Sequence, residues 1–343
     1  MKAEKTTRLA ASMADIAALC PSVRLGDESR LVVLADLRMG DGGKKDRLAR
    51  SGKALFSVLG RWYLPRGYTL VLNGDIEDIR NFWLKDILAA WPKMYALFDA
   101  FKEDGGLRKI AGDRDLGLLR LRSYPYELSH GLRLDLDDRS LLVLHGHQAS
   151  PPYLGRDYLS DYIVHWLGSS KRPKPEEADA EGRLRFEAER RLYRAASSLG
   201  IVAIQGHTRR PLFESRTNRE SIRAEVERLL REEDPRKSGS KVDEDRSLVL
   251  PCLFSPGRVL GAKVEGSRAL RMLEIRGGSL RMVRWTAEPR VSAARRGETA
   301  TPGSNEASKA EAESIELGGK SYSRVETRSA PIRGLFERIS LLG

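Results

Sequence analysis

Residues 69–78 read TLVLNGDIED and decide the fold class. A run of apolar and β-branched residues is followed at once by the polar turn Asn73-Gly74-Asp75, which is how a buried strand ends. Strand-like runs at 31–35, 109–111, 141–144 and 201–205 likewise lead into an ionisable residue, or into a glycine and then an ionisable residue. Repeated strands that end in polar loops predict an α/β protein.

The composition is that of a folded protein with one large core or two smaller ones. Hydrophobic residues make up 41% of the 343 residues, and no apolar run approaches the roughly 18 residues that a membrane span needs. Cys20 and Cys252 match no disulfide or metal-ligand spacing, so we expect a cytoplasmic setting. The net charge of +12 favours anionic partners, although scattered arginines are also typical of a solvated surface.

Five segments are expected along the chain. They are an N-terminal helical extension (1–28), one main domain (29–285) with a helical insertion at about 153–198, a disordered linker or tail (286–330), and a short C-terminal amphipathic helix (331–343). Within the main domain, residues 132–144 predict a hairpin, and strand-like runs at 248–254, 259–264, 270–275 and 279–285 suggest a second sheet. The C-terminal helix would either dock on the domain or contact a membrane surface.

The five strand ends carry three carboxylates and two imidazoles. They are Asp36, Asp75, Asp113, His145 and His207. Loops at the carboxyl ends of strands on one sheet gather at one edge, so we expect these side chains to converge. Carboxylates mixed with imidazoles suit Mn, Fe or Zn, which predicts a divalent metal site. Taken singly, each residue has a plainer interpretation as a turn cap or a hydrogen-bonded strand end.

The order of these residues resembles the calcineurin-like metallophosphoesterases. The family blocks are Asp-x-His, Gly-Asp-x-x-Asp/Glu, Gly-Asn-His-Asp, His-Gly and Gly-His-x-His. The corresponding blocks here are Asp36-Leu37-Arg38, Gly74-Asp75-Ile76-Glu77-Asp78, Gly112-Asp113-Arg114-Asp115, His145-Gly146-His147 and Gly206-His207-Thr208-Arg209. The match spans about residues 29–285 and is similar to a bacterial branch, the UDP-2,3-diacylglucosamine pyrophosphatase-type enzymes. It implies a four-layer α/β/β/α sandwich with two mixed sheets flanked by helices.

The resemblance also implies that one of the family's two metal positions is lost. Two histidines of the first position are replaced by Arg38 and Arg209, and a guanidinium has no lone pair to offer a metal. Together the two arginines carry a charge of about +2, which equals that of the dication they replace. We interpret them as its substitute, balanced by carboxylates; the alternative is that they point to solvent in a decayed site.

The second metal position keeps its ligands. They map onto Asp75, Asp113, His145 and His207, with Asp36 close by. The family's third-block histidine, which contacts the substrate phosphate and protonates the leaving group, is Arg114 here. An arginine can hold a phosphate but does not donate a proton near neutral pH.

Two functions follow from this pattern. The first is a metal-dependent phosphoester or pyrophosphate hydrolase with one Mn, Fe or Zn ion, in which Asp36 orients water or pairs with Arg38, and Arg38, Arg114 and Arg209 hold the phosphate. The second is a catalytically inactive pseudo-phosphoesterase that binds a phosphate-bearing ligand or partner and needs no metal. The ligand would be a phosphate-containing small molecule or a lipid-linked nucleotide. A nucleic-acid binder is a weaker alternative, because no recognition motif is present.

Overall fold

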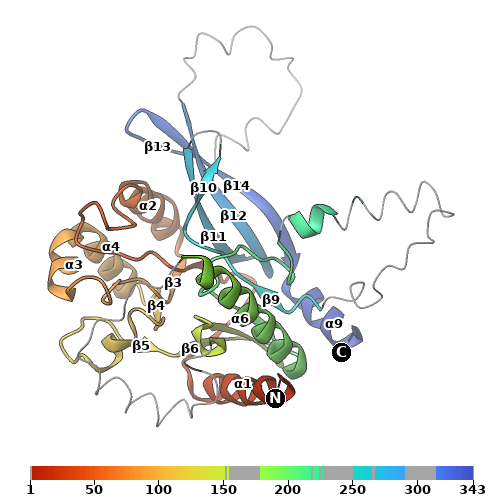
Figure 1. The fold of residues 1–343 in the computed structure, drawn as a ribbon. Helices are drawn as coiled ribbons and strands as arrows, with labels where there is room; N and C mark the ends of the chain where they lie inside the picture. Colours follow the sequence, from red (N-terminus) through yellow and green to blue (C-terminus); the bar gives the residue numbers. More distant parts are fainter. Residues whose placement is uncertain are drawn as a thin grey trace, which may run out of the picture.

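Two mixed β-sheets lie face to face between layers of helices (Figure 1). The computed structural model describes residues 2–150, 153, 178–217, 219–223, 226, 250–264, 267–289 and 314–342. The arrangement confirms the predicted α/β class, with two mixed sheets flanked by helices.

The larger sheet has nine strands in the order β13-β14-β12-β11-β2-β3-β4-β5, with β10 paired to β11. Its strands are β2 (Arg30–Leu34), β3 (Thr69–Asn73), β4 (Leu107–Ile110), β5 (Leu128–Ser129), β10 (Leu260–Val264), β11 (Ser267–Arg276), β12 (Ser279–Pro289), β13 (Ser314–Leu317) and β14 (Lys320–Pro331). The strands β2 to β5 run parallel, whereas β11 is antiparallel to β2. The carboxyl ends of β2, β3 and β4 therefore open on one edge.

The smaller sheet has five strands in the order β1-β6-β7-β8-β9. They are β1 (Ser22–Arg24), β6 (Gly131–Leu136), β7 (Arg139–Leu144), β8 (Val202–Ile204) and β9 (Leu253–Phe254). The predicted hairpin is the β6–β7 pair, and β7, β8 and β9 run parallel.

The prediction that the four late strand-like runs together form a second sheet is wrong. Of the four late strand-like runs, only β9 joins the smaller sheet, whereas β10, β11 and β12 extend the larger one through β2. A strand-like run specifies an extended conformation but not its pairing partner, which is set by burial on both faces.

Alternation of side chains along the central strands separates two cores. In β2, Leu31 and Val33 face the space between the sheets, while Val32 and Leu34 face the other side, and all four are buried. Each such side chain contributes roughly 1.5–3 kcal/mol by leaving water.

Helices cover the outer face of each sheet. On the smaller sheet lie α1 (Lys2–Leu19) and α6 (Ala178–Leu199); on the larger sheet lie α2 (Gly52–Val58), α3 (Leu84–Ala90) and α4 (Pro92–Glu103). Short turns of helix occupy Leu59–Tyr63, Leu64–Arg66, Leu116–Arg120 and His147–Ala149. No helix among the described residues has the length and apolar character needed to cross a membrane.

Much of the tail expected to be disordered is strand. Residues 286–289 extend β12, and β13 and β14 form a hairpin that pairs with β12; residues 290–313 lie outside the described residues. The turn of the β13–β14 hairpin is Gly318-Gly319, and both glycines have positive φ. The Gly277-Gly278 turn between β11 and β12 has the same sequence and the same backbone conformation. The hairpin was missed because β14 is polar, and a buried ion pair, Arg324 Nη2 to Glu274 Oε2 at 2.6 Å, anchors it.

The C-terminal helix α9 (Ile332–Leu342) packs on the domain. Its four spaced apolar residues, Ile332, Leu335, Phe336 and Ile339, are all buried in the core that contains the smaller sheet. That side of the helix is thus occupied by the chain itself. The predicted N-terminal extension contains α1 and β1, and the part of the predicted insertion that is described, residues 178–198, lies in α6.

Candidate functional site

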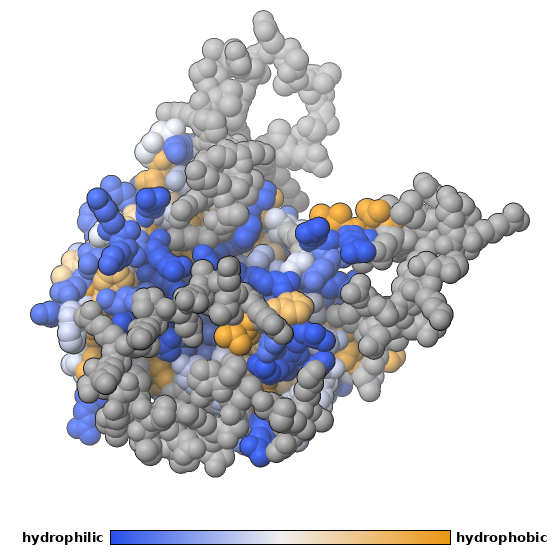
Figure 2. Space-filling view, viewed as in Figure 1, coloured by the Kyte–Doolittle hydropathy of each residue, from blue (hydrophilic) through white to orange (hydrophobic). Residues whose placement is uncertain are grey.

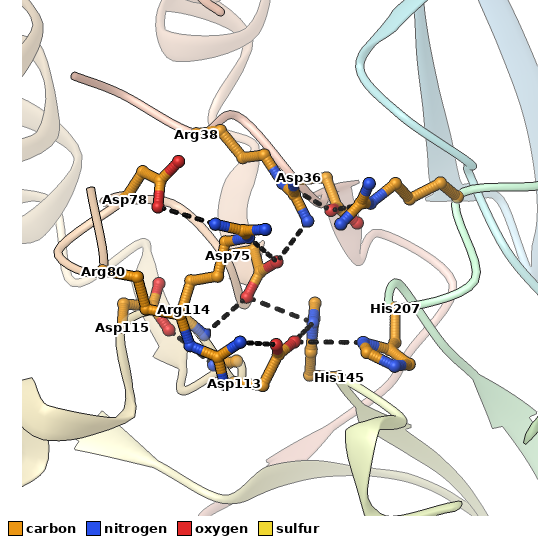
Figure 3. Close-up of polar contacts among 12 residues, drawn as sticks. Asp36, Arg38, Asp75, Asp78, Arg80, Asp113, Arg114, Asp115, His145 and His207 are labelled. Carbon is orange, nitrogen blue, oxygen red and sulfur yellow. Dashed lines mark hydrogen bonds and ion pairs between the residues drawn. The ribbon is translucent and has the colours of Figure 1, made fainter. Parts of the chain in front are cut away.

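The five predicted strand-end residues lie together (Figure 3). Asp36, Asp75 and Asp113 follow β2, β3 and β4 of the larger sheet, and His145 and His207 follow β7 and β8 of the smaller one. The expectation of a single sheet edge is therefore corrected: the acidic residues come from one sheet and the histidines from the other. The site lies where the two sheets meet.

The backbone at the site is held in an unusual conformation. Asp36, Arg38, Asp75 and Arg209 all have positive φ, between 53° and 60°. Non-glycine residues in this region cost of order 1–3 kcal/mol each and persist where surrounding structure fixes them, often at functional sites. Here Asp36 N–H donates to Gly74 O (3.1 Å) and Arg38 N–H donates to Asp75 O (2.9 Å).

Gly74 allows the two sheets to approach at this point. Its φ is 78°, and a Cβ at this position would lie 2.4 Å from His145 Nδ1. Any side chain here would displace His145, so the glycine of the Gly-Asp block is needed for close approach.

His145 presents one ring nitrogen to the acidic residues. Its Nδ1 lies 2.9 Å from the carbonyl oxygen of Asn73, which can only accept, so Nδ1 carries the proton. Its Nε2 lies 3.4 Å from Oδ1 of Asp75 and 3.4 Å from Oδ1 of Asp113. That nitrogen is fully buried and makes no hydrogen bond of good geometry with the described residues.

His207 is held in a similar way by both of its nitrogens. Its Nδ1 lies 3.0 Å from Asp113 Oδ1, and its Nε2 shares a 2.8 Å hydrogen bond with Ser150 Oγ. One ligand atom each from Asp113, His145 and His207 lies within 4.8 Å of the other two, which is close enough to hold a metal ion. We refer to these three residues with Asp75 as the histidine half of the site.

Charges in the histidine half strongly perturb its titration. Burial opposes charge on His145, but Asp75, and then Asp113 and Asp36, outweigh it and raise the pKa of the imidazole to about 10. Burial and the neighbouring Asp113 raise the pKa of Asp75. For Asp113 burial acts in the same sense, yet His207 and His145 hold its pKa well below the usual range. The clustered carboxylates thus favour positive charge at this point.

The other half of the site, which we call the arginine half, contains Asp36, Arg38 and Arg209. Arg38 donates to Asp36 Oδ1 (3.2 Å) through Nε and to Asp75 Oδ2 (3.1 Å) through Nη2. Arg209 Nε donates to the same Asp36 Oδ1 at 2.9 Å. The side chains of Arg38 and Arg209 are only 3% and 6% exposed, so neither points to solvent. Burial lowers the pKa of Arg38, but Asp75 and Asp36 outweigh it and raise the pKa.

Arg114 and Arg80 also pair with carboxylates of the cluster (Figure 3). Arg114 donates its backbone N–H to Asp75 Oδ1 (3.0 Å) and its Nη1 to Asp78 Oδ1 (3.0 Å). Arg80 Nη1 lies 3.2 Å from Asp113 Oδ2, and Nη2 donates to Tyr153 (2.9 Å). Their side chains are 17% and 30% exposed, more than those of Arg38 and Arg209.

Sequence reasoning missed Arg80. It lies just beyond the Gly-Asp block, where the only signal was a basic residue two positions after Asp78.

Two acidic residues of the blocks serve the scaffold. Glu77 accepts from Lys109 (2.7 Å) and from Tyr124 (2.6 Å) in a buried network. Asp115 accepts backbone N–H groups from Gly112 and Ile76, and burial together with Asp75 raises its pKa to about 7. Both fix the loops that carry Asp75 and Asp113.

The ligand set fits a divalent ion. Carboxylate oxygens and imidazole nitrogens suit Mn, Fe or Zn, and the Nε2 of His145, which makes no hydrogen bond of good geometry with the described residues, would gain a close partner. The second nitrogen of each histidine is held by a protein oxygen, as is usual for metal-binding histidines. The arginine half could not bind the same ion without displacing a guanidinium.

Comparisons with known proteins give structural neighbours only. No family model and no curated protein matches the chain. Among solved structures it is similar to a Vps29 single mutant from Entamoeba histolytica (12% identity, 87% of this chain and 99% of that chain, TM-score 0.31). It is also similar to YfcE, a phosphoesterase from E. coli (14%, 74% and 91%, TM-score 0.33), and to Chaetomium thermophilum Vps29 (10%, 90% and 99%, TM-score 0.36). At these sequence identities and TM-scores, no residue role is transferred from these proteins to this chain.

Proposed function

We propose that this chain has the calcineurin-like metallophosphoesterase fold and is a phosphoester or pyrophosphate hydrolase that uses a single divalent ion. Asp75, Asp113, His145 and His207 would hold the ion. Arg38 and Arg209 would stand in for a second ion. Within that fold, the sequence blocks lead us to propose a relationship to the bacterial UDP-2,3-diacylglucosamine pyrophosphatase-type branch.

The observation that carries the proposal is the environment of His145 Nε2. This buried nitrogen lies 3.4 Å from two carboxylates without a hydrogen bond of good geometry, and Nδ1 is already bonded to Asn73 O. A bound cation in place of the Nε2 proton would contact the nitrogen and both carboxylates at once. When bound, the ion would supply Lewis acidity and a nucleophile at neutral pH.

The arginines divide into two roles on this proposal. Arg38 and Arg209 neutralise Asp36 and Asp75 and are too deeply buried to reach a substrate. Arg114 and Arg80 are more exposed and would orient the phosphoryl group, each with donors left over from its ion pair. This narrows the sequence-based assignment, in which Arg38 and Arg209 were also expected to hold the phosphate.

A pseudo-phosphoesterase is the second candidate, favoured by the lack of an evident proton donor among the site residues that the structure describes. Arg114 occupies the position of the family's acid and stays protonated near neutral pH. His147 is fully buried, and burial together with the charge on His145 lowers its pKa well below the usual value. Leaving groups that need protonation would then react slowly, whereas good leaving groups would not be affected.

Metal content and turnover separate the two candidates. The purified chain is loaded with Mn²⁺, desalted and analysed by elemental mass spectrometry, with Asp75→Asn as the control. We expect one ion per chain, lost in the control, and cleavage of bis(p-nitrophenyl) phosphate that depends on it. One ion without cleavage would favour the pseudo-phosphoesterase, and no ion would overturn the metal centre.

A further inference from the structure

Two arginines lie directly opposite each other on neighbouring strands of the larger sheet. In the β11–β12 ladder, Arg271 is the register partner of Arg284. Side chains at opposite positions of an antiparallel pair share one face, with Cβ atoms about 4.5–5.5 Å apart, and like charges placed there are destabilising. The fold thus brings two guanidinium groups together at a place that no sequence block marks.

This arginine pair lies on the face of the larger sheet that is turned toward the smaller sheet. Two residues along the ladder, Leu273 pairs with Met282, and both are buried in the core that contains the smaller sheet. Arg271 and Arg284 share that face but are partly exposed, and Val325, opposite Arg284 on β14, is 36% exposed. Between α2 and α6, where β11 lies in Figure 1, the visible surface is largely hydrophilic (Figure 2). These surroundings suit a polar ligand.

The charge of the pair is not balanced within the part of the chain that the structure describes. Arg281, Arg324 and Arg328, from the same strands, each lie within 4.0 Å of a glutamate oxygen. Neither Arg271 nor Arg284 has an ion pair of that length with any described residue. Nε of Arg284 is also buried and has no hydrogen-bond partner among them, and a buried donor in that state costs free energy. A bound anion would relieve both the repulsion and the missing hydrogen bond.

Hydroxyl groups lie in the next row of the same face. Thr286, two residues beyond Arg284 on β12, is the register partner of Ser323 on β14, and both are partly exposed. Two residues along a strand cover about 7 Å. Guanidinium groups supply several N–H donors in a fixed fork, and each hydroxyl supplies one O–H donor. This set of donors suits a tetrahedral oxyanion, whose oxygens can each accept hydrogen bonds.

We propose that Arg271 and Arg284, with the hydroxyl groups of Thr286 and Ser323, bind a tetrahedral oxyanion. The ligand is a sulfate or phosphate group, either as the free ion or as the monoester of a small molecule. This binding site goes beyond the proposed function, because it shares no residue with the candidate functional site and no bond of the ligand is broken there. Because the anion contacts β11, β12 and β14 only in the folded chain, its binding stabilises the larger sheet.

Sulfate is the probe for this site, because it is tetrahedral and contains no phosphorus that could be hydrolysed. The full chain is labelled with ¹⁵N and titrated in EDTA at constant ionic strength, and NMR follows the Nε–Hε resonance of Arg284. The variant Arg284→Lys identifies that resonance by its disappearance. The test variant is Arg271→Gln. The control is Arg281→Gln, which removes the same charge from β12 on the opposite face of the sheet.

In the unmodified chain we expect the Arg284 resonance to shift and then saturate as sulfate is added. Arg271→Gln should weaken sulfate affinity at least about tenfold, whereas Arg281→Gln should change it by less than about threefold. The backbone amide spectrum checks that each variant is folded. Absence of a saturable shift, or equal losses of affinity in the test and control variants, would overturn the site.

Two further titrations identify the source of the oxyanion and the independence of its site. Tighter binding of phenyl sulfate than of sulfate would support the site with a monoester as ligand, and equal or weaker binding would support it with the free ion. Arg80→Gln/Arg114→Gln alters only the proposed phosphoryl contacts and should leave the Arg284 titration unchanged. If this double variant abolished the shift, sulfate would be bound at the candidate functional site and the separate site would be overturned.

Discussion

The two halves of the site neutralise similar carboxylates in opposite ways. In the histidine half, Asp75 and Asp113 face imidazoles, which on the proposed function would hold an exchangeable ion with them. In the arginine half, Asp36 and the other oxygen of Asp75 face guanidinium groups that are part of the chain and never lose their charge. On the proposed function, two side chains would permanently fill one dication position while the neighbouring position stays exchangeable.

Arg38→Ala should have the largest effect on stability. It leaves Asp75 Oδ2 with only the more distant Arg114 Nε (3.8 Å) and removes one of two partners from Asp36, and breaking a buried pair typically costs about 3–5 kcal/mol. Urea unfolding at pH 7 in EDTA measures the loss. The control is Arg139→Ala, whose exposed ion pair at 3.8 Å should contribute less than about 1 kcal/mol. Equal losses in both variants would mean that Arg38 carries no special charge balance.

His145→Ala should abolish Mn²⁺ binding in the histidine half. Outer partners of a metal ligand are worth about 10–100-fold in affinity, so loss of a ligand should cost at least about 100-fold. Mn²⁺ calorimetry measures it, with His130→Ala as a histidine control outside the cluster. If His145→Ala binds as well as the unmodified chain, the ion lies elsewhere.

Arg38→His/Arg209→His should convert the arginine half into a second metal-binding position. The double variant removes two guanidinium groups and supplies two imidazoles beside Asp36, whose Oδ2 is buried without a hydrogen-bond partner. We expect the Mn²⁺ stoichiometry to rise from one to two by elemental mass spectrometry. Arg38→Gln/Arg209→Gln, which removes the charge but offers no imidazole, should stay at one.

Ser150→Ala should weaken metal binding more modestly. Ser150 Oγ holds Nε2 of His207 at 2.8 Å, which directs Nδ1 toward Asp113. We expect a loss in Mn²⁺ affinity of between about 10- and 100-fold, with recovery in Ser150→Thr. A loss that threonine fails to restore would indicate a packing effect rather than orientation of the ring.

The smallest expected step is the change in metal affinity over a single pH unit. The pKa of His145 is raised to about 10, so in the metal-free chain its charge stabilises the fold fully below about pH 6.5, and this contribution is lost as the pH rises through 10. Metal binding must displace that proton, so Mn²⁺ affinity should rise about tenfold per pH unit between pH 6.5 and 8.5. Calorimetry in buffers of different ionisation enthalpy counts the proton, and an affinity independent of pH would contradict a protonated His145.

The sequence predicted much of the site because the site residues directly follow strands that are recognisable from their apolar residues. Asp36, Asp75, Asp113, His145 and His207 each follow a short strand, and all five lie in one cluster. Sequence periodicity could not reveal that two different sheets supply them, since pairing depends on partners distant in the chain. Nor could it find Arg80, which lies outside every motif block and contacts Asp113 only in the folded chain.

The fold was predicted best where strands have a clear apolar pattern and worst where a polar strand is held by backbone hydrogen bonds and an ion pair. The β6–β7 hairpin follows a clear apolar pattern. The β13–β14 hairpin is largely polar, yet its ladder with β12 runs from Pro331 to Lys320 and is held by the buried ion pair of Arg324 with Glu274. Hydrophobic patterning is blind to such a strand, although Gly318-Gly319 marked its turn.

The pairing of β2 with β11 affects when the protein can fold during synthesis. Leu31 at the start of the larger sheet lies beside Ile275, and β12 then pairs with β14 up to Pro331. These contacts are far apart along the chain, and such topologies close their loops slowly. The edge of β2 therefore leaves the ribosome before its neighbour β11 has been made, and it stays exposed to wrong pairing until β11 arrives.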